Sequence, residues 1–247
     1  MKEYPIYRLA NYAYKHAFWM YSPLYAGYKM LTDRMERKII RRLVKPGDCV
    51  LDIGANIGFY TRYFSRLVGP AGEIHAFEPD AAHFQRLTQR TGHWPNVHRY
   101  HAAVGEKTGT ITLYLSDALN VDHRTYPVEE DSRKTVEINC VCLDSRFSEK
   151  KVDFIKMDTQ GYEYAILQGM QAILQRSANL RMILEFWPAG LRKAGSSPEA
   201  VLQLLRDHGF EIYLVSSTSI VRFHESLIRT QGTEYYNLFV TRQPLAL

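Results

Sequence analysis

The amino-acid sequence predicts a doubly wound α/β fold, largely parallel with an antiparallel edge strand, preceded by a helical arm. Short apolar runs bounded by glycine or proline recur along the chain, helical patterns alternate with most of them, and a hairpin-like connection joins the last two. The chain has 247 residues, 46% apolar and 23% charged, which suits one domain with appendages. We expect residues 1–45 to form the arm and residues 46–247 the α/β domain.

The arm is rich in aromatic residues and in positive charge. Four tyrosines recur at every seventh position, as in one stripe along a helix: Tyr7, Tyr14, Tyr21 and Tyr28. Pro23, with Ser22 as a cap, predicts a break into two helices, and Thr32 is expected to cap a third. Ten Lys/Arg against three acidic residues give residues 1–45 a net charge of +7, whereas the whole chain carries +5.

The segment from residue 48 to 61 reads DCVLDIGANIGFYT. Cys49 to Ile53 is a short apolar run between glycines, typical of a buried strand in a parallel sheet. A glycine turn and a helical pattern follow, and the start of such a helix offers free backbone N–H groups to a ligand. The spacing of Gly54 and Gly58 differs from the G-x-G-x-x-G of dinucleotide enzymes, and the loop has no Walker lysine. The segment therefore favours a turn that binds S-adenosylmethionine (SAM) over a phosphate cradle.

Two acidic residues end neighbouring strands beside this turn. Asp52 ends the first strand and is suited to bind the ammonium group of SAM, directly or through water. Glu78 ends the next strand, twenty residues after Gly58, where its carboxylate can accept hydrogen bonds from both ribose hydroxyls. The other candidate cofactor contacts lie in or near the same turns: Gly54, Ala55, Asn56, Gly58, Tyr60, Thr61, Pro79 and Ala103.

The remaining elements alternate between helices and strands. Asp80 is expected to cap a helix that ends near Thr91, and Ser197 to cap another that ends at Gly209. Core strands are predicted at 96–104, 152–158, 180–186, 211–215 and 234–242. Two further strands, joined by a long polar loop, alternate as in an antiparallel sheet: 109–115 and 135–143.

Three segments resemble the FkbM family of SAM-dependent O-methyltransferases: VLDIGANIGFYT, HAFEPD and VDFIKMDTQGYEYAILQGM. The resemblance runs from about residue 30 to residue 242, leaves the aromatic arm outside, and is most specific in the third segment. It implies a class I (Rossmann-like) methyltransferase fold. It also implies methyl transfer from SAM to a hydroxyl of a sugar, a polyketide or another small metabolite, with S-adenosylhomocysteine as product. The resemblance assigns SAM contacts to Asp52, Gly54, Asn56, Gly58 and Glu78, and a place beside the reaction centre to Asp158 and Glu163.

Asp158 and Glu185 end neighbouring predicted strands, so their carboxylates should meet in one crevice. An aliphatic hydroxyl holds its proton tightly, and we expect a base or a metal to assist its removal. The candidate bases are Asp158, Glu185 and His123, the last from the long polar loop. Alternatively, Asp158 and Glu185 could hold Mg²⁺, which would lower the pKa of the hydroxyl. Glu163 either belongs to the reaction centre or caps the helix that starts near Gln160.

Two rival functions are open to test. The basic, aromatic arm would suit a nucleic-acid methyltransferase, but the body has no basic stripe and the Asn/Asp-Pro-Pro-Tyr motif of amino-methylating enzymes is missing. A non-catalytic binding protein of the same fold would have no need of acidic residues at all four strand ends.

The arm has three interpretations: helices packed on the body, a lid over the acceptor pocket, or a segment that contacts lipid through residues 4–30, with a lipid-linked glycan as acceptor. Three scattered cysteines indicate a reducing, cytoplasmic compartment, and neither a signal peptide nor a membrane-spanning run is evident. We therefore expect a cytoplasmic protein whose membrane contact, where it occurs, is peripheral.

Overall fold

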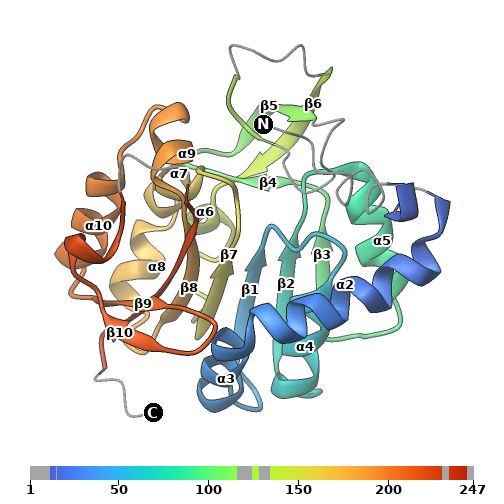
Figure 1. Cartoon of the computed structure of the whole chain (residues 1–247), viewed down its shortest axis with the longest axis horizontal. Helices are drawn as coiled ribbons and strands as arrows, with labels where there is room; N and C mark the ends of the chain where they lie inside the picture. The colour runs from blue at the N-terminus through green and yellow to red at the C-terminus, as the bar shows by residue number, and fades with distance from the viewer. Residues whose placement is uncertain (1–11, 15, 116–123, 128–133, 230–233, 244–247) are drawn as a thin grey trace.

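A computed structural model describes residues 12–14, 16–115, 124–127, 134–229 and 234–243. An eight-stranded sheet forms its centre, in the strand order β10-β9-β11-β8-β7-β1-β2-β3 (Figure 1). The strands are β1 (Cys49–Ile53), β2 (Glu73–Phe77), β3 (Val97–Tyr100), β7 (Phe154–Met157), β8 (Arg181–Phe186), β9 (Glu211–Val215), β10 (Ile220–Arg222) and β11 (Tyr236–Thr241). Neighbours from β3 to β8 pair in parallel, whereas β11 runs antiparallel to both β8 and β9.

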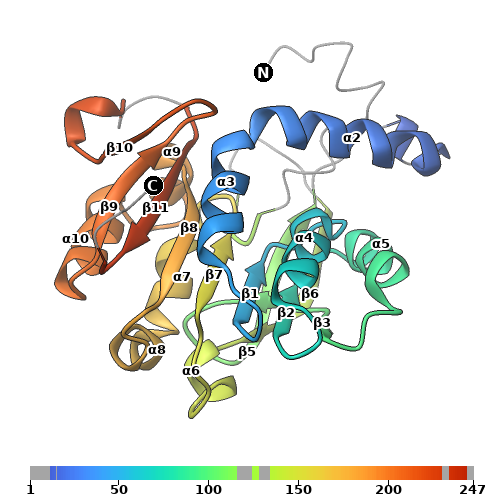
Figure 2. The same ribbon diagram turned by 90° about the horizontal axis from the view of Figure 1, so that it is seen from below.

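Helices cover both faces of this sheet. The helices of the described residues are α2 (Phe18–Thr32), α3 (Arg34–Leu43), α4 (Phe59–Val68), α5 (Ala81–Thr91), α6 (Leu143–Arg146), α7 (Glu163–Gln168), α8 (Gln171–Arg176), α9 (Pro188–Lys193), α10 (Pro198–Asp207) and the 3₁₀ helix η1 (Glu225–Leu227). Figure 2 shows α3 and α4 on one face and α6 to α8 on the other. Successive strand residues therefore enter different cores, Val50 packing with Ile40 and Phe64 on the first face and Leu51 with Leu167 on the second.

A small second sheet lies beyond the carboxyl ends of the central strands. It has the order β4-β6-β5, formed by β4 (Ala103–Val104), β5 (Gly109–Leu115) and β6 (Lys134–Val141). Figure 1 places it at the end of the molecule toward which the arrows of β1 and β2 point. The antiparallel pairing of β5 with β6 confirms the two extra strands that the alternation predicted.

The structure corrects three details of the sequence prediction. The predicted strand 96–104 is two strands, because the chain bends at His101 and Ala102 and β4 joins the second sheet. α2 is one continuous helix, so the predicted break at Pro23 with Ser22 as a cap is wrong. Pro23 is exposed, and on that side water can satisfy the carbonyl that its missing N–H leaves free. Asp33, rather than Thr32, is the N-cap of α3.

Two predicted helix caps are confirmed. Asp80 Oδ1 accepts a hydrogen bond of 2.8 Å from the backbone N–H of His83, and Ser197 Oγ accepts one of 3.0 Å from that of Ala200. α3 buries its apolar side in the core of the α/β domain, and the division of the chain at residue 45 stays a prediction. Across the described ranges, none of the helices combines the length and the apolar character needed to cross a bilayer.

The strand order reverses between β1 and β7. The chain runs from β1 outward to β2 and β3, and then returns to place β7 on the other side of β1. Loops that leave the carboxyl ends of such strands diverge and open a crevice between them, where ligands bind in open α/β sheets. The residues after β1, β2, β7 and β8 are therefore the ones to search for a site.

Candidate active site

The loops that leave β1 and β7 touch at Gly54. This glycine has φ +78°, and a Cβ added to it would lie 2.0 Å from the carbonyl oxygen of Asp158. Gly58, the N-cap of α4, has φ +79°, and its Cβ would lie 2.8 Å from a side-chain carbon of Leu87. Both positions favour glycine for the left-handed backbone, and Gly54 also for the space, because its neighbour is a backbone atom. Because these glycines have no side chains, the backbone of the turn is left uncovered at these two positions. Contact of the turn with SAM stays a prediction.

A cavity of about 470 Å³ opens at the carboxyl ends of β1, β2 and β7, within the size range of small-molecule sites. Five of the predicted cofactor residues line it: Gly54, Asn56, Glu78, Pro79 and Ala103. Asp158 and Glu185 line it as well, so the structure brings the two predicted carboxylates to the same cavity as the glycine turn. α2 completes one wall with Tyr25, Tyr28 and Lys29.

Glu78 is held in a defined position at the end of β2. Its Oε2 accepts a hydrogen bond of 2.7 Å from the backbone N–H of Asn56, and its Oε1 one of 2.9 Å from that of Asp80. Burial works to lower the pKa of the adjacent His83, but the carboxylates of Glu78 and Asp80 outweigh it and raise this pKa. Each carboxylate oxygen can accept a further bond, so Glu78 can bind ribose hydroxyls while it stays tied to the turn.

Some predicted cofactor residues lie behind the glycine turn instead of lining the cavity. Asp52 is buried, and Thr61 Oγ1 donates a hydrogen bond of 2.6 Å to its Oδ2. Burial raises the pKa of Asp52 to about 6. Ala55 is buried against Leu87. The roles of Asp52, Thr61 and Ala55 in SAM binding stay predictions.

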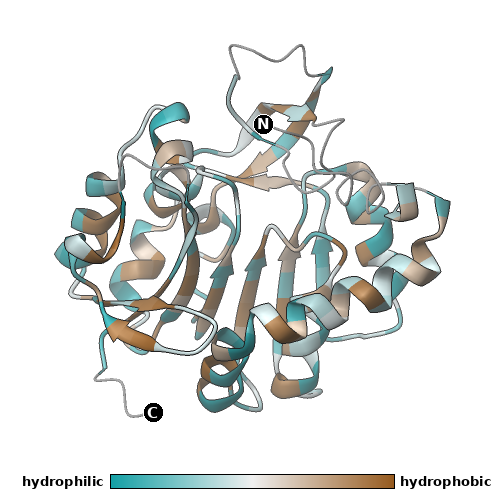
Figure 3. Cartoon of the chain, viewed as in Figure 1, coloured by the Kyte–Doolittle hydropathy of each residue, from teal (hydrophilic) through white to brown (hydrophobic). Residues whose placement is uncertain are grey.

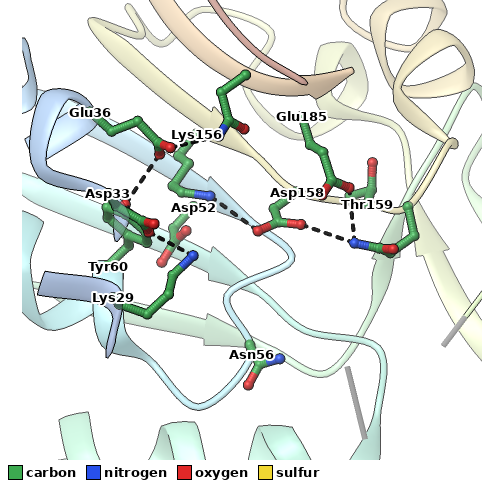
Figure 4. Close-up of polar contacts among 12 residues, drawn as sticks. Lys29, Asp33, Glu36, Asp52, Asn56, Tyr60, Lys156, Asp158, Thr159 and Glu185 are labelled. Carbon is green, nitrogen blue, oxygen red and sulfur yellow. Dashed lines mark hydrogen bonds and ion pairs between the residues drawn. The ribbon is translucent and has the colours of Figure 1, made fainter. Parts of the chain in front are cut away.

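Asp158 and Glu185 lie next to each other, bridged by an amide (Figure 4). Gln160 Nε2 donates a hydrogen bond of 2.9 Å to Glu185 Oε2 and lies 3.4 Å from Asp158 Oδ1. On the other side of Asp158, the ammonium of Lys156 lies 3.3 Å from Oδ2. Lys156 is itself 6% exposed, so its charge is balanced inside the protein and not by water.

The surroundings push the pKa values of these two carboxyl groups apart. Burial works to raise the pKa of Asp158, but the ammonium groups of Lys156 and Lys29 outweigh it and hold this pKa below its usual range. Burial also raises the pKa of Glu185 well above the usual value, and the negative charges of Asp158 and Glu163 add to the rise. The surroundings therefore favour the ionised form of Asp158 and the protonated form of Glu185.

Glu163 supports the loop that carries Gln160. Its Oε1 accepts hydrogen bonds from the backbone N–H groups of Thr159 and Gly161, both at 3.2 Å, and from the Thr159 hydroxyl at 2.9 Å. None of these partners is the backbone N–H of Gln160, to which Glu163 would reach back as a cap of the helix that the sequence places near Gln160. Burial raises the pKa of Glu163 to about 7, and its Oε2 has no hydrogen-bond partner among the described residues. A place for Glu163 beside the reaction centre stays a prediction.

The arm is tied to the cavity by a polar network (Figure 4). Lys29 of α2 forms an ion pair of 2.6 Å with Asp33, which also accepts a hydrogen bond of 2.7 Å from the hydroxyl of Tyr60. The same hydroxyl lies 3.2 Å from buried Glu36, which accepts a bond of 2.8 Å from Asn237 of β11. Tyr60, a predicted SAM contact, therefore directs its hydroxyl toward the arm; its role at the cofactor stays a prediction.

Sequence reasoning missed three residues of this site, Lys156, Gln160 and Lys29. Lys156 left a signal, because a lysine inside the apolar strand VDFIKMD needs a buried counter-charge. Gln160 has φ +56°, an uncommon backbone for a residue with a side chain, and the sequence pattern gives no sign of it. His123, a predicted base, lies outside the described residues.

The family profile that matches this chain describes a methyltransferase FkbM domain and covers residues 52–212, more than half of the sequence. The chain belongs to the FkbM methyltransferase family. Its matched segment holds the glycine turn, Glu78, Asp158 and Glu185. The family resemblance expected from the three sequence segments is therefore confirmed.

Curated relatives of this FkbM protein include two methyltransferases. The 2-O-methyltransferase NoeI of Sinorhizobium fredii is 25% identical over 162 residues, 58% of this chain and 66% of the relative. The hexuronic acid methyltransferase AglP of Haloferax volcanii is 27% identical over 179 residues, 70% of this chain and 69% of the relative. The chain thus spans about two thirds of the length of each.

Solved structures agree on the fold. A putative rRNA methylase from Clostridium thermocellum matches with a TM-score of 0.52 at 11% identity, over 84% of this chain and 93% of that one. A putative methyltransferase from Streptococcus mutans, solved with S-adenosylhomocysteine, matches with a TM-score of 0.51 at 11% identity, over 84% of this chain and 96% of that one. At this identity the likeness concerns the fold alone, and it confirms the predicted class I methyltransferase architecture.

Proposed function

We propose that this chain transfers a methyl group from SAM to a hydroxyl group of a sugar. The observation that carries the proposal is the Asp158–Gln160–Glu185 cluster, which faces the same cavity as the glycine turn in a chain of the FkbM family. The name of the relative AglP, a hexuronic acid methyltransferase, supports a sugar as the acceptor class. SAM supplies an electrophilic methyl group on a sulfonium cation, which is a good leaving group.

The residues present fit this cofactor. Gly54 and Asn56 offer a backbone surface without bulky side chains, and Glu78 offers carboxylate lone pairs at the end of β2 for the ribose hydroxyls. The acidic residues of the cavity also suit the positive charges of the sulfonium and the ammonium. Because the cofactor carries its own leaving group, the protein has two tasks, which are to align the acceptor oxygen and to take its proton.

Glu185 is the base that the electrostatics favour for this second task. A general base works best when its pKa lies near the working pH, and the pKa of Glu185 is raised in that direction. Asp158 stays ionised beside Lys156, so it can orient the acceptor hydroxyl and oppose the charge of the sulfonium. Gln160 holds the two carboxylates in a fixed relation through its amide.

A magnesium ion fits this carboxylate pair poorly. The ammonium of Lys156 lies 3.3 Å from Asp158, and the amide of Gln160 donates to Glu185, so donor groups occupy the places next to both carboxylates. Mg²⁺ requires an octahedron of oxygen ligands, and neither an ammonium group nor an amide NH₂ group can serve as one of them. We therefore assign proton removal to protein side chains.

Methyl transfer from isotope-labelled SAM to a panel of acceptors tests the proposal. The panel contains uronic-acid and neutral oligosaccharides, a hydroxylated polyketide and a short RNA. We expect label in a sugar and formation of S-adenosylhomocysteine. Label in RNA would favour the nucleic-acid function, and failure of calorimetry to detect SAM binding would favour a non-catalytic binding protein.

Replacement of Glu78 should act on the cofactor. In Glu78→Ala the ribose loses its carboxylate and the N–H of Asn56 loses its partner. We expect the Kd for SAM to rise by about one to two orders of magnitude, the cost of one or two hydrogen bonds to a charged group. Calorimetric titration with S-adenosylhomocysteine measures this, and turnover at saturating SAM should fall much less. An unchanged Kd would contradict the assignment.

Replacement of Asp158 should act on the reaction. In Asp158→Asn, Lys156 loses its ion pair and turns to Glu185 as a counter-charge, which lowers the pKa of the base. We expect kcat to fall by at least about 100-fold. The Kd for SAM should stay within about tenfold, or roughly 1.4 kcal/mol. Equal losses of binding and turnover would place Asp158 at the cofactor instead.

A further inference from the structure

The outward side of α2 is uncharged and largely apolar along the whole helix. Eight of its residues are exposed: Trp19, Met20, Pro23, Leu24, Gly27, Tyr28, Met30 and Leu31. Within the described part of the chain, seven of the ten exposed large apolar side chains belong to residues 12–31. A surface helix of a globular protein normally turns its polar side to water. α2 does the opposite, and such a contiguous patch marks an interaction surface.

The inner side of α2 is anchored by polar and aromatic contacts. Arg90 of α5 donates a hydrogen bond of 2.7 Å to Ser22 Oγ, and the guanidinium of Arg86 lies 4.2 Å from the ring centre of Phe18. Lys29, the one charged residue of α2, points inward to Asp33. These contacts fix which side of the helix faces outward, so the apolar side cannot turn into the body without losing them.

The next helix presents positive charge. Each exposed residue of α3 is basic: Arg34, Lys38, Arg41 and Arg42. Its one acidic residue, Glu36, is buried and bonded to Asn237. In Figure 3 the ribbon of α3 carries teal and brown side by side, as expected for one charged and one apolar side. The exposed sides of α2 and α3, called here the α2–α3 surface, thus join an uncharged, mostly apolar helix to a basic one.

We propose that the α2–α3 surface docks the protein on an anionic lipid bilayer. Trp, Tyr, Leu and Met side chains on a helix that lies in the interface plane bury their apolar groups at the headgroup boundary, and nearby Lys and Arg bind anionic headgroups. Each Lys or Arg near an anionic membrane surface adds a similar electrostatic contribution to the free energy of binding. The absence of a spanning helix among the described residues agrees with contact in the plane of the membrane.

Charge and side-chain type favour lipid over other partners. An RNA-binding surface combines basic residues with aromatic rings on which bases stack. The outward side of α2 carries no cationic group, and half of its exposed residues are leucine or methionine. A symmetric contact with a second copy would bring two basic α3 helices toward one another. An anionic bilayer complements both helices at once.

The docked orientation would place the cavity beside the headgroups. Tyr25 and Tyr28 of α2 line the cavity, so the helix that meets the bilayer is also a wall of the site. If the proposed function holds, the acceptor sugar could therefore arrive on a lipid carrier in the membrane plane. The docking itself is independent of methyl transfer, and SAM binding measured on the same variants separates the two proposals.

Flotation of the full-length protein with vesicles tests the docking. Neutral phosphatidylcholine vesicles are compared with vesicles that contain phosphatidylserine, at low and at high salt. We expect binding to the anionic vesicles, weakened by salt, together with a blue shift in the emission of Trp19, which is 78% exposed. Leu24→Gln with Leu31→Gln should weaken this binding at least about tenfold, and Lys38→Gln with Arg41→Gln should do the same.

Matched variants elsewhere on the surface serve as controls. Leu227→Gln replaces another exposed leucine and Lys107→Gln another exposed lysine, and both should bind vesicles as the parent protein does. Because all the replaced side chains are exposed, thermal unfolding and SAM binding should stay unchanged in each variant. The proposal would be overturned if the protein did not float with anionic vesicles, or if the control variants lost vesicle binding as strongly as the surface variants. It would also be overturned if the protein bound RNA in a salt-sensitive way but no vesicles, or if it formed a dimer that Leu24→Gln with Leu31→Gln abolished.

Discussion

Replacing Glu185 with glutamine should lower kcat by about two to four orders of magnitude, the usual contribution of a general base. Glutamine keeps the shape and can still meet the amide of Gln160, so the change removes mainly the ability to accept a proton. The Kd for SAM should stay close to that of the parent protein. Steady-state kinetics at saturating SAM, with calorimetry for the cofactor, measures both quantities.

The pH dependence of kcat/KM should also identify Glu185 as the base. A base works only when it is deprotonated, so activity is lost as the pH falls through its pKa. Because burial and the charge of Asp158 raise the pKa of Glu185, the acid limb of kcat/KM should lie above the usual range of a glutamate, about 4.3. Glu185→Asp should keep the limb at a reduced rate, whereas Glu185→Gln should remove it.

A small effect of Glu185→Gln would point to another base. Kinetics within about fivefold of the parent protein would be too little for the loss of general base catalysis. His123, predicted as a base from the sequence, would then be the first residue to replace. An unchanged acid limb in Glu185→Gln would lead to the same conclusion.

The place of the glycine turn beside Glu78 could be predicted because its signals are local. The glycine turn after β1 and the carboxylate that ends β2 belong to a single strand–helix–strand unit, and the spacing of Gly58 and Glu78 follows from that geometry. Asp158 and Glu185 followed from a second rule, since parallel neighbouring strands end at the same edge of a sheet.

The charged residues that act on Asp158 and Glu185 could not be predicted in the same way. Lys29 reaches the cavity from a helix of the arm, and no local pattern links it to Asp158, which follows β7 far along the chain. The roles proposed for the two carboxylates depend on this lysine and on Lys156, so the sequence alone left base and metal chemistry open. Pro23 was misread for a related reason, because the exposure of that side of α2 decides whether a proline is tolerated.

Lys156 should prove essential to stability as well as to the site. Lys156→Met keeps the length of the apolar stem in β7 but leaves Asp158 without its ion pair and removes one of the two positive charges, Lys156 and Lys29, that act on buried Glu36. Breaking a buried pair on one side typically costs about 3–5 kcal/mol, and we expect the lower end because Asp158 is 35% exposed toward the cavity. Urea unfolding at pH 7 measures the loss.

The pH dependence of that loss identifies its cause. In the parent protein the pKa of Asp158 is lowered, so its contribution to stability is present above its unfolded-state pKa and is lost as the pH falls through the folded value. Without Lys156, only Lys29 and the amide of Gln160 oppose the effect of burial, so we expect the pKa of Asp158 to rise and its ionised form to contribute less to folding. The stability difference between parent and variant should therefore narrow as the pH is lowered from 7 toward about 4.

A double replacement separates the ion pair from simple packing. Lys156→Met with Asp158→Asn removes both charges, so it should recover part of the stability that Lys156→Met alone loses, giving a coupling energy of about 1–3 kcal/mol. The stability losses of the two single replacements could instead be additive, and the stability difference between parent and variant could be the same at pH 7 and at acid pH. Lys156 would then matter for its packing against the ring of Tyr60, whose centre lies 4.5 Å from its ammonium. A positive coupling would instead make Lys156 the residue that keeps Asp158 ionised and thereby assigns the proton to Glu185.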